Sequence, residues 1–481
     1  MSRTREFSPL LATVLILAAL TTVGEAQTYS VLYNFGTKSG DPNQPSYSGI
    51  IVQGRDGNLY STAPGGGTLG AGAAFEVTPI GAVTVLYNFD VTHGAGPFSG
   101  LVLATNGNFY GTTSCCGSPG RGTVFKITPD GHLTVLHTFM GGSDGEFPNA
   151  PPVQGTDRNF YGTTSAGGGS PFCSGGCGTV YKITPSGTLT ILHAFNSGGG
   201  SAPTAPLLQA SDGKFYGTAS YGGHSEGGVI FKITPSGKFT VLYKFDSIHG
   251  YEPYAPLVQG TDGNLYGTTR GGGPSRFGVV FKITTSGNLT VLHSFNGTDG
   301  SGPIGGLVQA ADGNFYGSTQ TGGNSSNCLG GCGTIFRITP QGVHSVLYNF
   351  DNTTGAFPGV TIFQHTNGLL YGDTSGGGTG NVKPCAPPTI TCGVFYSLNV
   401  GLGPFVSLLP YSGKVGTTVE FLGQGFKGTT GVSFNGTPAP TFKVVSGTYL
   451  TAKVPSGATT GFVTVTTPKR KLRSNKKFRV N

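Results

Sequence analysis

Tryptophan is absent from this chain of 481 residues, and charged residues make up only 10% of it. The missing tryptophan removes the side chain that stacks best on sugar rings, although tyrosine can serve in its place. After the first 26 residues no amphipathic helical pattern is found. The recurring segments are instead rich in Val, Ile, Thr, Tyr and Phe, residues that suit a pleated sheet. These features predict an all-β protein.

Long apolar runs are also scarce. One such run, Leu10–Leu20, follows Arg3 and Arg5 and precedes Gly24-Glu25-Ala26. This is the layout of a secretory signal peptide, so we expect residues 1–26 to be removed after Ala26. The run is too short for a transmembrane helix, which needs about 20 residues. We therefore predict a secreted or cell-surface protein with no transmembrane segment after signal removal.

The formal net charge of +8 is concentrated in one place. Seven basic residues lie in one short stretch near the C-terminus: Lys469, Arg470, Lys471, Arg473, Lys476, Lys477 and Arg479. A nucleic-acid binder usually has a broad basic face, which the rest of the chain does not supply. We predict no nucleic-acid partner and interpret the stretch as a solvated hairpin, with an anionic polymer or a membrane as the alternative.

The most informative feature is a unit that recurs seven times at intervals of about 50 residues. It reads L-V-Q-x-x-D-G-N-F-Y-G-T-T, a Gly-rich stretch, then G-T-V-F-K-I-T-P-x-G-x-L-T-V-L-x-x-F. Its central tyrosines are Tyr60, Tyr110, Tyr161, Tyr216, Tyr266, Tyr316 and Tyr371. Because they recur so regularly, we interpret them as core residues between units.

Each unit contains four β-prone segments separated by turn signals. In the fifth unit these segments are Pro256–Gln259, Leu265–Thr269, Val279–Thr284 and Leu289–Phe295. Asp-Gly and Ser-Gly pairs between segments favour tight hairpins, because glycine accepts positive φ. Four antiparallel strands, repeated radially, form a β-propeller blade.

The strand count predicts how such a ring would close. The segment V-L-x-x-F occurs seven times, but its first copy, Val31–Phe35, stands alone, and the last unit lacks one. We expect this N-terminal strand to complete the last blade, giving a seven-bladed propeller over residues 27–400. Closure would remove exposed sheet edges. An open solenoid is the alternative and would leave the first strand without a partner.

The repeat ends after Leu402, and residues 405–481 contain six or seven short segments of a different kind. P-Y-S-G-K-V-G-T-T-V-E-F-L-G-Q-G-F, G-V-S-F-N-G-T and A-K-V-P-S-G-A-T-T-G-F-V-T-V-T-T-P follow one another. This stretch resembles an IPT/TIG domain, which implies a small immunoglobulin-like β-sandwich. Such sandwiches serve many purposes, so this resemblance implies a fold and no specific role.

The repeated unit also resembles a known family. D-G-N-F-Y-G-T-T, G-T-V-F-K-I-T-P-x-G and L-T-V-L-H-x-F together are similar to the GloVer tandem repeat of exported bacterial proteins, including choice-of-anchor proteins. The likeness spans residues 29–398. It implies an exported bacterial protein and supplies no catalytic residues to transfer. Unlike the anchored members, this chain shows no sorting signal after its sandwich.

The repeats differ mainly in the connections between the second and third strands and between units. In a propeller these connections share one face, and function concentrates on variable loops of a rigid scaffold. All eight cysteines fall there: Cys115, Cys116, Cys173, Cys177, Cys328, Cys332, Cys385 and Cys392. In an exported chain we expect disulfides between local pairs. Free thiols remain open for the adjacent pair, and zinc is a weaker alternative because no histidine has matching spacing.

Two polar series recur inside the unit. The first comprises Gln53, Gln154, Gln209, Gln259, Gln309 and Gln364, with Leu103 in the remaining slot. These side chains would ring the central channel, where they either bind an ion or a sugar or bond to neighbouring backbone; we favour the second. The aspartates of the D-G-N turns interchange with asparagine, which indicates turn formation and not a calcium site.

No catalytic motif such as H-E-x-x-H or G-x-S-x-G is present. The densest polar and aromatic group comprises His224, Glu226, His249, Tyr251, Glu252 and Tyr254, which we take as the candidate ligand site. We predict no catalytic residue, metal or cofactor, and a non-enzymatic module that binds an extracellular polysaccharide or protein. The alternative is a propeller hydrolase or lyase acting on an extracellular polysaccharide or lactone over the channel. The oligomeric state is left open.

Overall fold

The computed structural model describes residues 27–45, 50–117, 120–223, 225–379 and 392–481. The predicted signal peptide, His224 and Cys385 lie outside these ranges. The described residues form β-strands joined by turns, with two single-turn 3-10 helices, η1 (Gly142–Asp144) and η2 (Ser197–Gly199). The predicted all-β class is therefore confirmed. Among the described residues, no helix has the length and apolarity needed to span a membrane.

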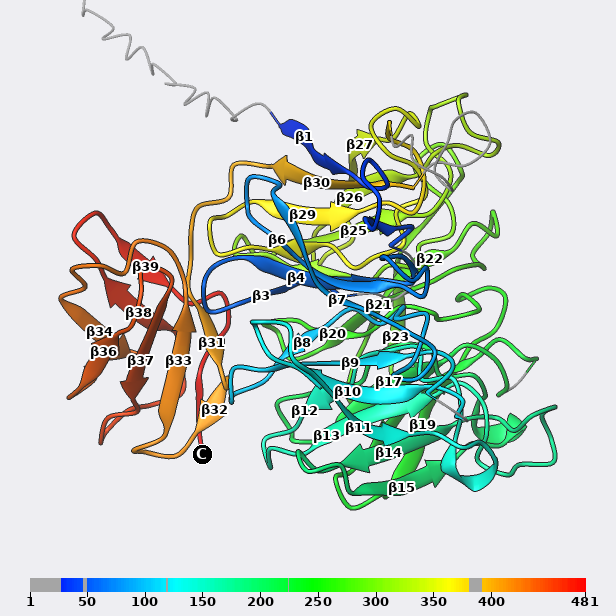
Figure 1. Cartoon of the computed structure of the whole chain (residues 1–481), viewed down its shortest axis with the longest axis horizontal. Coiled ribbons are helices and arrows are strands. Elements are labelled where there is room, and N and C mark those ends of the chain that lie inside the picture. Colours follow the sequence, from blue (N-terminus) through cyan, green and yellow to red (C-terminus); the bar gives the residue numbers. More distant parts are fainter. Residues whose placement is uncertain (1–26, 46–49, 118–119, 224, 380–391) are drawn as a thin grey trace, which may run out of the picture.

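Seven four-stranded antiparallel sheets account for the repeat region in the part of the chain that the structure describes (Figure 1). The first sheet comprises β3 (Val52–Gln53), β4 (Leu59–Ala63), β6 (Ala73–Val77) and β7 (Val83–Asn88). The second comprises β8 (Val102–Leu103), β9 (Phe109–Thr113), β10 (Thr123–Ile127) and β11 (Leu133–Thr138). The third comprises β12 (Val153–Gln154), β13 (Phe160–Thr164), β14 (Thr179–Ile183) and β15 (Leu189–Ala194). The fourth comprises β16 (Leu208–Gln209), β17 (Phe215–Ala219), β18 (Val229–Ile233) and β19 (Phe239–Lys244).

The remaining repeat strands follow the same plan. The fifth sheet comprises β20 (Val258–Gln259), β21 (Leu265–Thr269), β22 (Val279–Ile283) and β23 (Leu289–Ser294). The sixth comprises β24 (Val308–Gln309), β25 (Phe315–Thr319), β26 (Thr334–Ile338) and β27 (His344–Asn349). The seventh joins β28 (Phe363–Gln364), β29 (Leu370–Asp373) and β30 (Val394–Asn399) to the N-terminal strand β1 (Thr28–Asn34). A small ribbon, β2 (Pro42–Asn43) with β5 (Gly65–Gly66), lies beside them.

The N-terminal strand lies where the strand count placed it. β1 pairs antiparallel with β30, with Thr28 opposite Asn399 and Asn34 opposite Val394. These two strands are therefore about 360 residues apart in the chain and adjacent in one sheet. The pairing supplies the seventh sheet with the outermost strand that its own repeat lacks.

Aromatic packing holds neighbouring sheets together. The Tyr110 ring stacks on Phe160 of the next sheet with centroids 3.9 Å apart, and Tyr161 stacks on Phe215 at 4.0 Å. These rings are at most 1% exposed. Each tyrosine hydroxyl in turn bonds to the turn residue four positions earlier, as Tyr161 does to Asp157 at 2.9 Å. The repeated tyrosines therefore belong to the core, and the repeated aspartates fix the turns.

One glycine shows why the turn between the third and fourth strands cannot vary. Gly81 has φ +94°, and a Cβ there would lie 2.4 Å from the Leu32 carbonyl oxygen of β1. A side chain would therefore meet both backbone strain and a steric clash. Gly131 and Gly187 approach Leu86 and Leu136 of the preceding sheet in the same way. The glycine lets successive sheets approach closely.

The C-terminal residues form a separate sandwich, which confirms the predicted immunoglobulin-like domain. One sheet has the order β31 (Ser407–Leu409), β33 (Thr418–Leu422), β37 (Tyr449–Lys453) and β36 (Phe442–Val444). The other has the order β35 (Thr437–Pro438), β34 (Gly431–Phe434), β38 (Val463–Thr466) and β39 (Lys471–Arg473). A short parallel pair joins β32 (Ser412–Gly413) to β40 (Arg479–Val480). Val419, Phe421, Phe434 and Val463 are fully buried between the sheets.

Candidate functional site

The repeat sheets have two unlike faces. We call the side with the short turns between strands one and two, and three and four, the turn face; we call the opposite side the loop face. Figure 1 shows the sandwich strands on one side of the sheets and the long connections on the other. The sandwich contacts Arg55 and Thr366, which belong to the turns between strands one and two. It therefore lies on the turn face and leaves the loop face uncovered.

The predicted glutamine series forms a hydrogen-bond network on the turn face. Each glutamine Oε1 accepts a backbone N–H from the first turn of the preceding sheet. The pairs are Thr105–Gln154 at 2.9 Å, Thr156–Gln209 at 2.9 Å, Ser211–Gln259 at 2.8 Å, Thr261–Gln309 at 2.9 Å, Ala311–Gln364 at 3.0 Å and Thr366–Gln53 at 3.1 Å. The last pair joins the seventh sheet to the first. This geometry supports the interpretation that the glutamines connect neighbouring backbone.

A salt bridge fixes the sandwich to the first sheet. The Arg55 guanidinium donates to both carboxylate oxygens of Glu420, at 2.6 and 2.9 Å, and lies 4.9 Å from the centre of the Tyr449 ring. Glu420 is only 8% exposed. Thr448 Oγ1 also donates to the Arg55 carbonyl at 2.8 Å. Paired, planar contacts of this kind fix orientation as well as position.

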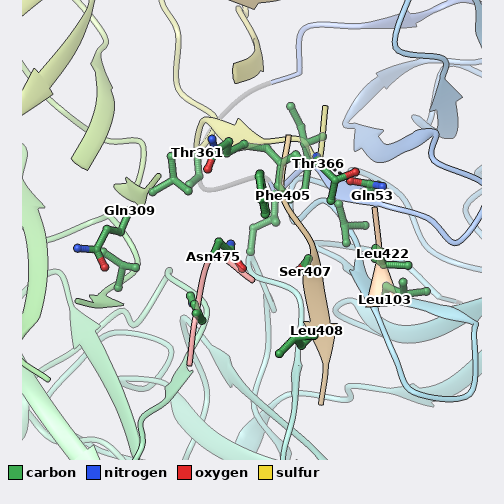
Figure 2. Close-up of a pocket in the computed structure, with 18 of the residues that line it drawn as sticks. Gln53, Leu103, Gln309, Thr361, Thr366, Phe405, Ser407, Leu408, Leu422 and Asn475 are labelled. Atoms are coloured by element: carbon green, nitrogen blue, oxygen red, sulfur yellow. Dashed lines mark hydrogen bonds between the residues drawn. The ribbon is translucent and has the colours of Figure 1, made fainter. Parts of the chain in front are cut away.

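A cavity of about 300 Å³ lies between the turn face and the sandwich (Figure 2). Its walls are mainly apolar and include Leu103, Val308 and Phe363 from the sheets and Phe405, Leu408 and Leu422 from the chain after them. Figure 2 shows Gln53 beside Thr366 at one end of the cavity and Gln309 at the other. The residues that line the cavity include no carboxylate and no imidazole. Its ionisable side chains are Tyr411 and Lys476, so neither a carboxylate nor an imidazole of the lining is available there for acid–base chemistry.

Of the six predicted ligand-site residues, the structure brings only two into one cluster, Glu252 and Tyr254. His224 lies outside the described residues. The His249 Nδ1 pairs with Asp246 at 2.9 Å within its own turn, and Glu226 accepts the Gly222 N–H at 3.1 Å. The Tyr251 ring lies over Gly271, where a Cβ would meet it at 2.2 Å. His249 and Glu226 therefore shape their own loops, whereas Tyr251 bonds to the connection that carries Arg270.

Glu252 and Tyr254 meet two side chains that were not predicted, Arg270 and Tyr221. Arg270 Nη1 donates to Glu252 Oε2 at 3.0 Å, and its guanidinium lies 5.9 Å from the centre of the Tyr254 ring. The Tyr254 and Tyr221 hydroxyls are hydrogen-bonded, and their rings meet edge to face at 6.2 Å. Burial raises the pKa of Tyr254, so its hydroxyl stays protonated at neutral pH. We call these four residues the loop-face cluster.

Comparing the repeats could have identified Arg270. It follows the second strand of its sheet, where the other sheets have Ser114, Ser165, Ser220, Gln320, Ser375 or Pro64. An arginine at a position where the other repeats have mostly serine departs from the repeat pattern. Such a departure indicates a residue kept for a ligand site and not for the fold. The Arg270 side chain is 50% exposed and Tyr221 is 37% exposed. The loop-face cluster therefore presents two aromatic edges and a guanidinium to solvent.

The cysteines stiffen the connections between the second and third strands. Cys173–Cys177 and Cys328–Cys332 form disulfides, as predicted for local pairs. Cys392 is also disulfide-bonded. Cys115 and Cys116 are free thiols with their sulfur atoms 3.0 Å apart, the alternative left open for the adjacent pair. Burial raises the pKa of Cys115 to about 11, which keeps it a thiol and a weak nucleophile.

One group of potential metal ligands occurs among the described residues, formed by His293, Asp299 and His344. The His293 Nε2 lies 2.9 Å from Asp299 Oδ2. The two imidazole rings stack face to face, 3.9 Å apart and 5° from parallel. Stacked parallel rings cannot both direct an in-plane lone pair at one ion, so this geometry fits packing between the fifth and sixth sheets. The same stack forms between His193 and Phe239.

Several solved structures are similar to this chain. A fungal alcohol oxidase in complex with copper is 13% identical with a TM-score of 0.50, and the match covers 94% of this chain and 99% of that one. The extracellular domain of a two-component system from B. thetaiotaomicron is 11% identical with a TM-score of 0.49, covering 93% and 57%. A gluconolactonase from Xanthomonas campestris is 12% identical with a TM-score of 0.39, covering 76% and 99%. At these identities the likeness concerns the fold alone. No curated protein matches the chain significantly.

Two family models match the sequence. The Gloeobacter/Verrucomicrobia repeat matches residues 18–173, 172–386 and 249–437, and the IPT/TIG domain matches residues 405–478. These matches cover the seven sheets and the sandwich and confirm both resemblances seen in the sequence. The chain therefore belongs to the Gloeobacter/Verrucomicrobia repeat family and ends in an IPT/TIG domain.

Proposed function

We propose that this chain is an exported, non-enzymatic binding module. Its seven sheets act as the blades of a closed β-propeller, and its loop face holds an extracellular ligand. The observation that carries the proposal is the division between the two faces. The turn face repeats its contacts and is covered by the sandwich, whereas the loop face differs from sheet to sheet and stays open.

Contacts between the first and last sheets support ring closure. The His365 Nε2 donates to the Gly57 carbonyl at 2.9 Å, and the Tyr371 hydroxyl donates to the Pro79 carbonyl at 3.2 Å. Gly81 of the first sheet approaches Leu32 of β1, as its counterparts approach their preceding sheets. The approach of Gly81 to Leu32 repeats at the seam a contact found between other neighbouring sheets, and the two hydrogen bonds add to it.

The loop-face cluster favours a polysaccharide as the ligand. Tyrosine rings offer flat apolar faces with polar edges, and an arginine beside a glutamate offers donors and acceptors for hydroxyl groups. Disulfides in two loops indicate a non-reducing compartment, where such polymers occur. The described residues that line the turn-face cavity include no carboxylate and no imidazole, which supports binding over catalysis.

A binding screen tests the proposal. The full secreted chain would be applied to neutral and charged polysaccharides and to extracellular proteins, beside the double variant Tyr254→Ala/Arg270→Ala. We expect one polysaccharide class to bind and the variant to lose roughly tenfold or more in affinity. The control Lys238→Ala lies in an exposed turn and should bind as the parent does. Unchanged binding by the double variant, binding of a protein only, or turnover of the polysaccharide would contradict the proposal.

A further inference from the structure

The sandwich and the propeller region carry opposite charge. Residues 405–481 contain eleven Lys and Arg but a single acidic residue, Glu420, a formal charge of +10. Residues 27–404 contain 15 basic and 17 acidic residues, a formal charge of −2. The net charge of the protein is therefore a property of one small domain.

The excess positive charge of the sandwich is concentrated on and beside the strand β39. β39 is the last strand in the order of its sheet, and on its other side the Val406 N–H donates to the Arg473 carbonyl. Within it Lys471 and Arg473 are exposed, whereas Leu472 between them is 1% exposed and belongs to the core. Alternate side chains point the same way along a strand, about 6.6 Å apart, so these two cations form the start of a row. Lys469 is also exposed and lies in the turn that leads into the strand, where it adds a third cation to this row.

No carboxylate neutralises this row. Glu420 already pairs with Arg55 of the propeller region. Among the described residues, none of the seven cations in the 469–479 stretch forms an ion pair. Lysine on an edge strand helps to prevent strand addition, which accounts for cations within β39 itself. Lys476 lines the cavity, 5.2 Å from the centre of the Tyr411 ring. The exposed cations Arg470 and Lys477, outside the strand, require another explanation.

An aromatic ring beneath the row orients part of it. The Arg473 guanidinium lies 3.5 Å from the centre of the Phe462 ring, and Lys477 Nζ lies 5.9 Å from it. These cation–π contacts hold the two charged side chains in place at the surface. The side chains therefore lose little conformational freedom when a ligand binds. Because the guanidinium covers Phe462, its ring is not free to stack on a nucleobase, as single-stranded nucleic acids require. Leu472 is buried, so the row also offers no apolar anchor to a membrane.

We propose that this basic edge of the sandwich binds an extracellular anionic polysaccharide. An exposed row of cations with no ion-pair partner among the described residues matches a linear polymer that carries repeated carboxylates or sulfates. The disulfides of the same chain indicate a non-reducing environment in which such polymers are the available polyanions. This site is separate from the loop-face cluster, so the two proposals can fail independently.

The test uses the full chain on immobilised dextran sulfate and polygalacturonate, with neutral dextran beside them. We expect retention on both anionic polymers, none on neutral dextran, and release as salt shortens the Debye length. The triple variant Lys469→Gln/Lys471→Gln/Arg473→Gln should bind about tenfold more weakly or worse. The matched variant Lys443→Gln/Lys453→Gln changes cations on the other sheet of the sandwich and should lose less than about threefold.

Several outcomes would overturn the proposal. They are equal retention on neutral dextran, parental binding by the triple variant, or a loss of equal size in the matched variant. Tighter binding to double-stranded DNA or to phosphatidylglycerol vesicles would assign the row to a different partner. Circular dichroism and thermal melting would verify that the variants fold. The loop-face variant Tyr254→Ala/Arg270→Ala should keep its dextran sulfate binding, which separates this result from the proposed function.

Discussion

The turn face and the loop face are built by the same seven repeats, yet only one of them is uniform. On the turn face six glutamines make the same backbone contact between neighbouring sheets. On the loop face the connections differ in length, disulfide content and charge. Arg270 and Tyr254 occur in only one sheet each. Structural constraint therefore explains what the repeats share, and we expect specific recognition where they differ.

Substituting a shared inter-sheet residue should have the largest effect. Phe160 is fully buried and stacks on Tyr110, so Phe160→Ala leaves a cavity between the second and third sheets. We expect a loss of about 3–5 kcal/mol in the free energy of unfolding. The matched control Phe172→Ala, 71% exposed on the loop face, should change it by less than about 0.5 kcal/mol. Denaturant titration measures both free energies of unfolding. Equal losses would contradict the distinction between shared core residues and the variable loop face.

Releasing the sandwich should have the next largest effect. Arg55→Ala leaves Glu420 largely buried without its partner, at a cost of about 2–4 kcal/mol after allowing for the partial exposure of Arg55. We expect the sandwich to separate from the sheets, which limited proteolysis near residues 400–405 would detect. The double variant Arg55→Met/Glu420→Leu removes both charges and should restore protection. Proteolysis of Arg55→Ala at the parental rate would show that the salt bridge does not hold the domains together.

A buried carboxyl group breaks the uniformity of the second strands. Asp373 occupies the slot of Thr62, Thr112, Thr163, Thr218, Thr268 and Ser318, and neither of its oxygens has a partner among the described residues. Burial raises the pKa of Asp373 to about 8. The folded state therefore keeps a proton that the unfolded chain releases, and stability should fall as pH rises from about 4 to 8.

Asp373→Thr should remove this pH dependence. At pH 8 we expect the variant to be more stable than the parent by about 1–3 kcal/mol, and near pH 4 the difference should shrink. Thermal melting across this pH range tests the prediction. A variant less stable than the parent at pH 8 would show that the carboxylate has a favourable role.

Single members of the glutamine network should matter least. Gln209→Leu removes the hydrogen bond from Thr156 N–H and the two that Gln209 Nε2 donates, to the Gly213 carbonyl and to Thr156 Oγ1. It copies the leucine that the second sheet already has at position 103. We expect a loss of about 1 kcal/mol and no change in ligand binding. Gln341→Leu, in an exposed turn, is the control. A loss of several kcal/mol would mean that the network is more cooperative than six separate bonds.

Much of the fold could be predicted because the sequence pattern of one four-stranded sheet occurs seven times. The second strand of the fifth sheet, Leu265–Thr269, was predicted to the residue, and Val31–Phe35 paired with the seventh sheet as expected. Asp-Gly turns are local, so sequence alone reveals them.

The candidate site was harder to predict because it depends on contacts between distant residues. The docking of Glu420 on Arg55 joins positions 365 residues apart, and neither residue stands out in the sequence. Proximity in the chain suggested that His249, Tyr251 and Glu226 belong together, but His249 and Glu226 bond within their own loops and Tyr251 bonds to Gly271. Tyr221 and Arg270 reach the cluster from two neighbouring connections, after β17 and after β21. Only Arg270 could have been recognised from the sequence, because the other repeats have Ser, Gln or Pro at the equivalent position.

The most direct test of the account compares the two faces in one ligand-binding measurement. The polysaccharide retained in the screen would be titrated against the parent, the loop-face variant Tyr254→Ala/Arg270→Ala and the turn-face variant Gln209→Leu. The account predicts a loss of roughly tenfold or more for the first variant and an unchanged dissociation constant for the second. A larger loss for the turn-face variant, with both proteins fully folded, would place recognition on the turn face and contradict the account.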